Sequence, residues 1–477
     1  MSGCVAVFDL GKTNRKLVVF DRTGKILAEK FEPNAPLPPD ADWPYLRLDT
    51  EGAWAFLTRS LKSVAVEFSI EAISITTHGA SCALVTDVDL ALPPMDYEFE
   101  GFQPVDADYD ALRPPFQETL SPKMPRGLNA GRMVFYAEQM FPKAFARATA
   151  FLTYPQYWAW RLSGVKAIEV TSIGSHTDLW APREARLSSM VEKLGWTRLM
   201  PPLCRGWETL GPIRPEVAQA TGLPASVRVV CGAHDSNASL VPHLSARTEP
   251  FTVLSTGTWV IIMAVGGTGP LYPELDMLAN VDVRGELVPT GRFMGGREFS
   301  ILAGDARAEP CAADIAALIA AGVMALPDFV GQGGPFLGKK GGIVGNPPQA
   351  PEGRVALATL YSALMSAHVL DLLQAPGDLI VEGGFNRSPA FAATLAGLMP
   401  GRNVAVAPTS GAAAGAAMLA NWQDKREPPR LSRAESWVIP GLADYRGRWE
   451  WLASESRGSN WTDRVRFAEQ INSGSRF

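Results

Sequence analysis

Two short polar turns, each between apolar segments, could bind phosphate. The first follows the strand-like segment Cys4–Asp9. Its candidate residues are Gly11, Lys12, Thr13, Asn14 and Lys16. A Walker A loop would require a glycine at position 6 and a helix after the turn. Position 6 is instead Ala6, and a second strand-like segment follows the turn. The turn therefore fits a β-turn-β phosphate clamp, whose backbone N–H groups face phosphate oxygens, or a plain hairpin with a charged tip.

The second polar turn lies within Thr252–Val260, T-V-L-S-T-G-T-W-V. Its candidate phosphate-binding residues are Thr256, Gly257 and Thr258. It repeats the strand–turn–strand pattern of the first turn, and a triphosphate bound between two domains requires a clamp from each. A third segment, Leu379–Phe391, ends a strand at Gly383-Gly384 before Phe385. Such glycines allow close approach of a flat ring or a phosphate, although an ordinary tight turn has the same pattern.

Two acidic residues near the ends of apolar strands could take part in phosphoryl transfer. Asp9 ends the first strand, where a carboxylate could hold Mg²⁺ through water because this ion keeps part of its hydration shell. Lys16 adds positive charge for the phosphates. Asp235 follows the strand-like Val227–Gly232 and begins a helix. It fits an ordinary helix start, and it also fits a general base that accepts the proton of an attacking hydroxyl group.

The segments that must position these residues alternate between strand and helix patterns. Strands are predicted at Lys16–Phe20, Ile26–Phe31, Ala72–Thr77, Phe251–Ser255, Trp259–Val265 and Leu379–Val381. Helices are predicted at Glu51–Phe68, Tyr154–Leu162, Ser188–Leu199, Ile315–Leu326, Arg354–Leu373 and Ser410–Trp422. Each half of the chain begins with a hairpin-rich sheet and continues with helix–strand units. This order predicts an α/β protein with two domains.

The composition limits the class of protein. A length of 477 residues suggests two domains of ordinary size. With 47% hydrophobic and 19% charged residues, the chain can bury a large core. A net charge of −5 gives no sign of a nucleic-acid-binding surface. Five dispersed cysteines fit buried thiols in a reducing cytoplasm, and the apolar runs are too short to cross a membrane. We expect a cytoplasmic protein with no nucleic-acid or membrane partner.

The order of the motifs resembles the FGGY family of carbohydrate kinases, in the actin/hexokinase/sugar-kinase superfamily. The motifs are D-x-G-x-T-x-x-K at Asp9–Lys16, G-x-x-D at Gly232–Asp235, S-T-G-T at Ser255–Thr258 and the Gly383-Gly384 strand end. Y-W-A-W-R-L-S-G and E-V-T-S-I-G-S-H-T-D-L-W are further family features, and H-D-S-N-A-S with L-S-T-G-T-W is most similar to rhamnulokinases and L-fuculokinases. The resemblance covers nearly the whole chain.

The resemblance implies two ribonuclease-H-like (actin-like ATPase) domains, each a mixed sheet flanked by helices, with an interdomain cleft. The expected boundaries are 1–245 for the N-terminal domain, 246–440 for the C-terminal domain and 441–477 for a helical tail. The implied activity is ATP-dependent phosphorylation of a sugar hydroxyl, with Asp9 at the Mg²⁺ site and Asp235 as the catalytic base. The two turns would bind the phosphates, and Gly383, Gly384 and Phe385 would lie beside adenosine. The sequence leaves the oligomeric state open, and a homodimer is one option.

Some positions depart from the family pattern. Lys12 stands where the family usually has a second hydroxyl residue, and Glu382–Phe385 replaces a run of small residues. The usual Gly-Glu-Arg becomes Gly338-Lys339-Lys340. Asp9 and Asp235 are unaffected, so we expect activity.

Sugar-facing residues are expected where strands end. The candidates are His78, Gly79, His234, Asp235 and Gln156, with Trp43 and Arg297-Glu298 as weaker ones. Each also fits a packed structural residue, and the G-G-R-E-F segment has no assigned role. The long connecting segment Pro93–Pro125 could cover the bound sugar. The expected substrate is a ketose of the L-fuculose, L-rhamnulose or ketopentose type. The alternatives are a polyol kinase, a non-catalytic sugar or nucleotide sensor of the same fold, and an actin-like ATPase.

Overall fold

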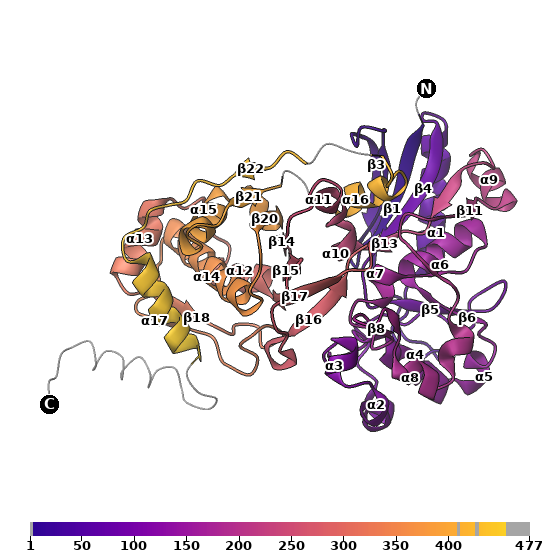
Figure 1. Cartoon of the computed structure of the whole chain (residues 1–477), viewed down its shortest axis with the longest axis horizontal. Coiled ribbons are helices and arrows are strands. Elements are labelled where there is room, and N and C mark those ends of the chain that lie inside the picture. The colour runs from indigo at the N-terminus through magenta and orange to yellow at the C-terminus, as the bar shows by residue number, and fades with distance from the viewer. Residues whose placement is uncertain (1–2, 408–410, 425–428, 455–477) are drawn as a thin grey trace. The chain divides into compact units, whose positions relative to one another are not determined.

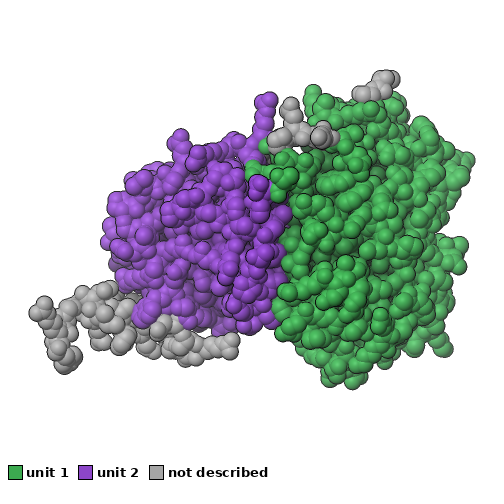
Figure 2. Space-filling view, in the orientation of Figure 1, with its two compact units in different colours: residues 1–248, 279–288, 410–429 green, residues 249–278, 289–409, 430–477 purple. Residues whose placement is uncertain are grey.

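The computed structural model describes residues 3–407, 411–424 and 429–454, and the chain forms two compact units (Figure 2). Unit 1 comprises Met1–Thr248, Ala279–Val288 and Ser410–Pro429. Unit 2 comprises Glu249–Leu278, Pro289–Thr409 and Arg430–Phe477. Each unit contains a mixed sheet accompanied by helices, which confirms the α/β prediction (Figure 1). The chain returns twice to unit 1 after its first long segment.

The main sheet of unit 1 has the strand order β11-β12-β4-β1-β2-β3, and β13 also pairs with β4. Its strands are β1 (Cys4–Leu10), β2 (Asn14–Phe20), β3 (Ile26–Pro33), β4 (Ile70–Thr77), β11 (Thr209–Pro212), β12 (Arg228–Val230) and β13 (Ala233–His234). Short polar turns make β1, β2 and β3 antiparallel neighbours. By contrast, β4 runs parallel to β1, β12 and β13. The first four strands were predicted to within about two residues.

Helices of unit 1 cover this sheet and extend beyond it. They are α1 (Thr50–Ala65), α2 (Asp106–Leu112), α3 (Phe116–Thr119), α4 (Ala130–Met140), α5 (Pro142–Phe145), α6 (Tyr154–Ser163), α7 (Val170–Ile173), α8 (Ser189–Lys193), α9 (Pro215–Thr221), α10 (Asp235–Ala238), α11 (Val241–Leu244) and α16 (Ala412–Leu419). The ring of Phe8 in β1 lies 6.4 Å from Phe56 of α1 and 5.2 Å from Trp158 of α6. β1 is apolar and almost wholly buried, so it forms part of the core. Its carboxyl end, which carries polar residues, is thereby held in a fixed position.

Short two-stranded sheets complete unit 1. Their strands are β5 (Cys82–Val85), β6 (Ala150–Thr153), β7 (Ile168–Glu169), β8 (Trp180–Ala181), β9 (Arg186–Leu187) and β10 (Leu203–Cys204). A second core cluster, rich in aromatic side chains, lies around α4 and the segment that follows β5. The segment 93–125, which was expected to be a long connection, contains α2 and α3 and is therefore partly helical.

The other seven-stranded sheet, most of whose strands belong to unit 2, has the strand order β16-β17-β15-β14-β20-β21-β22. Its strands are β14 (Phe251–Thr256), β15 (Val260–Val265), β16 (Met277–Val281), β17 (Leu287–Phe293), β20 (Asp378–Gly383), β21 (Val404–Val406) and β22 (Ser432–Arg433), with the separate pair β18 (Met324–Leu326) and β19 (Gly342–Val344). Its helices are α12 (Gly295–Ala303), α13 (Ala312–Ala320), α14 (Pro351–Leu372), α15 (Pro389–Leu398) and α17 (Leu442–Ser454). By length and composition α14 could cross a membrane, but 83% of its most apolar window is buried, as in a core helix.

Two predicted helices are wrong in extent. The segment 188–199 forms α8 and then a separate 3-10 turn at Trp196–Leu199, because Gly195 adopts a positive φ of 68° between them. The segment 315–326 forms the end of α13 and then β18, with Gly322 at a φ of 66° between them. A left-handed glycine is a common way to end a helix. The segment predicted as a helical tail begins with α17, and residues 455–477 lie outside the described residues.

Candidate active site

Three parallel strands of unit 1 bring the acidic and histidine candidates to one end of the sheet. Asp9 of β1 and Ala233 of β13 are both in register with Thr76 of β4, which lies between these strands. His78 follows β4, and Asp235 follows β13. In open α/β sheets, ligands bind beyond the carboxyl ends of the strands. Asp9, His78 and Asp235 therefore share the end of the sheet where a ligand site is expected.

The two carboxyl groups at this end influence one another. The pKa of Asp9 is raised to about 7, first by burial and then by the charge of Asp235, against the opposing charge of Lys16. Burial also raises the pKa of Asp235, whose side chain is 32% exposed. A cation would relieve the repulsion between these two carboxylates. A carboxylate with a raised pKa is also a better proton acceptor near neutral pH.

The donor set at this end fits a hydrated magnesium ion. Among the described residues, no group of three or more His, Cys, Asp or Glu side chains could enclose a metal. Mg²⁺ commonly retains several waters and uses one or two carboxylates together with substrate phosphates. The buried hydroxyl of Thr76, in register with Asp9, has no hydrogen-bond partner in the described part of the chain. Asp9 and Asp235 thus suit a metal ion whose remaining ligands are water molecules and phosphate oxygens of the substrate.

His234 orients the carboxylate of Asp235. Its Nδ1 lies 3.0 Å from Asn237 Nδ2 and 3.1 Å from Ser175 Oγ. Burial lowers the pKa of His234 to about 4, so the ring is neutral at pH 7. An amide nitrogen can only donate, so Nδ1 accepts and the ring proton lies on Nε2. This Nε2 is 3.3 Å from Asp235 Oδ1, and the imidazole therefore acts as a neutral donor toward that oxygen.

The other predicted sugar-facing residues differ in the polar atoms they leave available. His78 contacts the Gly79 carbonyl through Nδ1 at 3.1 Å, while its buried Nε2 has no hydrogen-bond partner among the described residues. A Cβ at Gly79 would lie 2.5 Å from His234 Nε2, so the glycine leaves room for that ring. Gln156 is fully buried and donates to the carbonyl of Cys231 at 2.9 Å. Gln156 therefore supports the chain just before β13.

The first predicted phosphate turn is a tight hairpin between β1 and β2. The N–H of Gly11 donates to the carbonyl of Asn14 at 2.9 Å, and the side-chain amide of Asn34 donates to the Gly11 carbonyl at 2.9 Å. Thr13 and Asn14 are exposed at its tip. The side chain of Lys12 instead makes ion pairs with acidic residues of a distant segment of unit 1.

The second predicted phosphate turn and the Gly-Gly segment lie side by side in unit 2. β14 and β20 are parallel neighbours with Thr256 in register with Gly383. Thr256 Oγ1 accepts from the N–H of Phe385 at 2.9 Å and donates to the carbonyl of Glu382. Gly383 has a φ of 82°, and a Cβ there would lie 2.0 Å from the Thr256 carbonyl oxygen. The close approach of the two strand ends therefore requires this glycine.

A pocket of about 520 Å³ opens beside the second turn. It is lined by Gly257, Thr258, Gly296, Arg297, Ser300 and Ile301. The start of α12 packs so closely on the turn that a Cβ at Gly296 would lie 2.0 Å from the Gly257 carbonyl oxygen. Gly296 and Ser300 were not among the residues predicted from the sequence, and Arg297 was predicted only as a weaker sugar-facing candidate. The Gly-Gly pair was the available signal, because it allows a helix N-terminus to approach a turn, and such termini suit phosphate.

Sequence patterns of known families match both halves of the chain. The C-terminal domain of FGGY carbohydrate kinases matches residues 248–428, and the N-terminal domain of the FGGY family of carbohydrate kinases matches residues 129–242. L-Fuculokinase from Salmonella typhi is 27% identical over 269 residues, which cover 55% of this chain. The chain spans 57% of that relative's length, and 56% of the L-fuculokinase from Escherichia coli (strain K12), which is 26% identical.

Solved structures extend the similarity to nearly the whole chain. A carbohydrate kinase from Novosphingobium aromaticivorans is 36% identical, with a TM-score of 0.88 over 95% of this chain and 99% of that one. A xylulose kinase from Lactobacillus acidophilus has a TM-score of 0.78 over 99% of both chains but is 15% identical, so it supports the fold alone. With matches to both domains of the family and a solved relative aligned over nearly its full length, the chain belongs to the FGGY family of carbohydrate kinases.

Proposed function

We propose that this protein transfers the γ-phosphate of ATP to a hydroxyl group of a ketose. The observation that carries the proposal is the convergence of Asp9, His78 and Asp235 at the carboxyl ends of three adjacent strands. An acid suited to a hydrated metal and an acid suited to proton transfer are both needed for phosphoryl transfer to an alcohol. The pocket of about 520 Å³ beside Gly257 and Thr258 supports the second requirement, a place for the donor.

In the proposed reaction, Asp235 accepts the proton of the sugar hydroxyl as its oxygen attacks the γ-phosphorus. The neutral ring of His234 donates to Asp235 Oδ1 and leaves the other carboxylate oxygen for the substrate. Mg²⁺, when bound near Asp9, would neutralise charge on the phosphates. The N–H groups of Gly11 and Gly257 donate within their own turns, so the N–H groups of the residues that follow them at the two tips are the ones suited to hold phosphate oxygens.

The class of substrate rests on two kinds of support. The L-fuculokinase relatives favour a ketose of the L-fuculose type, and the family resemblance extends this to L-rhamnulose and ketopentoses. The buried Nε2 of His78 and Oδ1 of Asn237 have no hydrogen-bond partners among the described residues. Both atoms lie near Asp235 in the fold and could each bind a sugar hydroxyl group, because buried polar groups are normally paired.

A substrate panel tests the proposed function. Purified protein would be incubated with Mg-ATP and L-fuculose, L-rhamnulose, L-ribulose, D-xylulose, glycerol or no acceptor, with ADP release and the phosphorylated product measured. We expect acceptor-dependent ADP release with at least one ketose. Turnover with glycerol alone would favour the polyol kinase, and sugar binding without turnover would favour the sensor.

Replacing Arg297 with alanine is expected to raise KM for ATP by about tenfold. The exposed Arg297 lines the pocket beside Gly257 and Thr258, where its guanidinium can bind a phosphate oxygen. Charge-assisted hydrogen bonds of this kind contribute about 1.5–3 kcal/mol. Arg307→Ala is the matched control, because Arg307 is exposed in unit 2 and does not line the pocket. Equal KM values for ATP in both variants and the wild type would remove Arg297 from the nucleotide site.

A further inference from the structure

Lys12 connects the first phosphate turn to a segment 84 residues further along the chain. Its Nζ lies 2.5 Å from both carboxylate oxygens of Asp96 and 3.1 Å from Glu98. The ammonium group also lies 4.7 Å from the ring centroid of Tyr97, within cation–π range. The side chain of Lys12 is 20% exposed, and that of Asp96 is 1% exposed. The positive charge of Lys12 is therefore paired with the acidic residues of this segment.

The segment that Lys12 holds forms one wall around His78. The ring of Tyr97 lies 5.5 Å from the imidazole of His78, at an interplanar angle of 73°. The backbone of Asp96 also holds the segment in place, because its N–H donates to the carbonyl of Leu46 at 2.8 Å. The Asp96 carboxylate accepts from the N–H of Glu98 at 2.8 Å. The carboxylate of Asp96 thus fixes the local turn, and Lys12 neutralises it.

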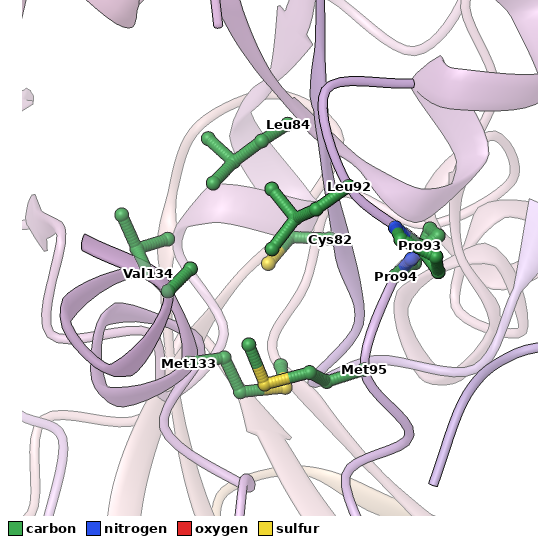
Figure 3. Close-up of a pocket in the computed structure, with 9 residues that line it drawn as sticks. Cys82, Leu84, Leu92, Pro93, Pro94, Met95, Met133 and Val134 are labelled. Atoms are coloured by element: carbon green, nitrogen blue, oxygen red, sulfur yellow. The ribbon is translucent and has the colours of Figure 1, made fainter. Parts of the chain in front are cut away.

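The preceding part of the same segment is held by the Leu48 N–H, which donates to the Pro94 carbonyl at 2.9 Å, and it also borders a small cavity. Leu92, Pro93, Pro94 and Met95 line a small apolar pocket of about 20 Å³, together with side chains of β5 and α4 (Figure 3). A space of this size corresponds to about one water molecule, and its apolar lining makes it unsuitable for a polar ligand. Figure 3 shows Met133 and Val134 facing Leu92 and Met95 across this space. The polar links at Asp96, together with the N–H of Gly127 that donates to the Tyr97 carbonyl at 2.9 Å, hold Tyr97 in position.

We propose that Lys12 is a positioning residue for the sugar acceptor, acting through Asp96 and Tyr97 on the wall beside His78. This inference rests on the proposed kinase function. Removal of the ammonium group would leave the buried Asp96 carboxylate without its partner, which is a costly state that the segment relieves by moving. A shift of the wall by about 1 Å is enough to impair acceptor binding strongly. The proposed role of the turn's backbone in phosphate binding does not depend on the Lys12 side chain.

The test compares Lys12→Met, Asp96→Asn and the double variant with the wild type. We expect Lys12→Met to raise KM for the sugar by about tenfold while KM for ATP changes by less than about twofold. The double variant removes both charges and should resemble Asp96→Asn alone, because Lys12 acts through Asp96. Lys30→Met is the matched control: Lys30 is exposed on β3, and this variant removes the same charge from unit 1. A rise in KM for ATP with an unchanged KM for the sugar would overturn the proposal and make Lys12 a phosphate ligand.

A second measurement separates this inference from the proposed function. Amide hydrogen exchange of residues 94–101 in the unliganded protein should be faster in Lys12→Met than in the wild type or Lys30→Met. Unchanged exchange would overturn the positioning role, whichever sugars are phosphorylated. If no acceptor in the panel is phosphorylated but exchange increases as expected, the link from Lys12 to this segment holds and the kinase function alone fails.

Discussion

Asp235→Asn is expected to lower kcat for sugar phosphorylation by about 10²–10⁴-fold, the usual contribution of a positioned general base. An amide cannot accept the hydroxyl proton, yet it has nearly the same shape as the carboxylate. The sugar should therefore still bind, which isothermal titration in the absence of ATP would measure. His234 Nε2 can still donate to the amide oxygen, so the local geometry around residue 235 should survive.

Asp108→Asn provides the control for this change, because Asp108 is exposed in the first turn of α2. It should leave both kcat and sugar affinity at wild-type values. Turnover by Asp235→Asn within a few fold of the wild type would contradict the base assignment. A loss of sugar binding equal to the loss of kcat/KM would instead make Asp235 a binding residue.

Local sequence patterns were sufficient to predict the strand ends that carry the acids. Asp9 is the last but one residue of the apolar β1, and Asp235 follows β12 and the short β13; period and composition within about ten residues define strands such as β1 and β12. The parallel pairing of β4 with β1 and β13 then brings these ends together. The two misjudged helices also contained a local signal, since Gly195 and Gly322 stand where a helix C-cap glycine is expected.

The remaining parts of the site depend on contacts between distant segments. The partner of Lys12 is 84 residues away, and the pattern around Lys12 gives no indication that Asp96 is the group it meets. Similarly, Arg297 becomes a pocket residue only because α12 packs against the Gly257 turn. Gln156 was predicted to face the sugar from its place at a helix start, but burial and the Cys231 carbonyl determine its contacts. Tertiary packing, which a local pattern does not encode, decides each of these cases.

Asp9→Asn is expected to raise the Mg²⁺ concentration needed for half-maximal activity by about 10- to 100-fold, or to abolish activity. The carboxylate of Asp9 is suited to hold the hydrated ion, and an amide supplies no charge for this purpose. Activity measured across a range of Mg²⁺ at saturating ATP and sugar would show the change. A Mg²⁺ dependence equal to that of the wild type would remove Asp9 from the metal site.

The same variant should be more stable than the wild type at alkaline pH without Mg²⁺. The pKa of Asp9 is about 7 in the folded protein against an ordinary value of 3.8, so folding favours its protonated form. The resulting penalty is absent below about pH 4, grows as the pH rises and is complete above about pH 7. Asp9→Asn should therefore raise the melting temperature at pH 8 by at least about 2 °C and change it little at pH 4. In the proposed metal site Mg²⁺ is held near the Asp9 carboxylate, so adding it at pH 8 should stabilise the wild type more than the variant. A variant that melts below the wild type at pH 8 in the absence of Mg²⁺ would show that the Asp9 charge stabilises the fold, and the raised pKa expected from burial and from the charge of Asp235 would then be wrong.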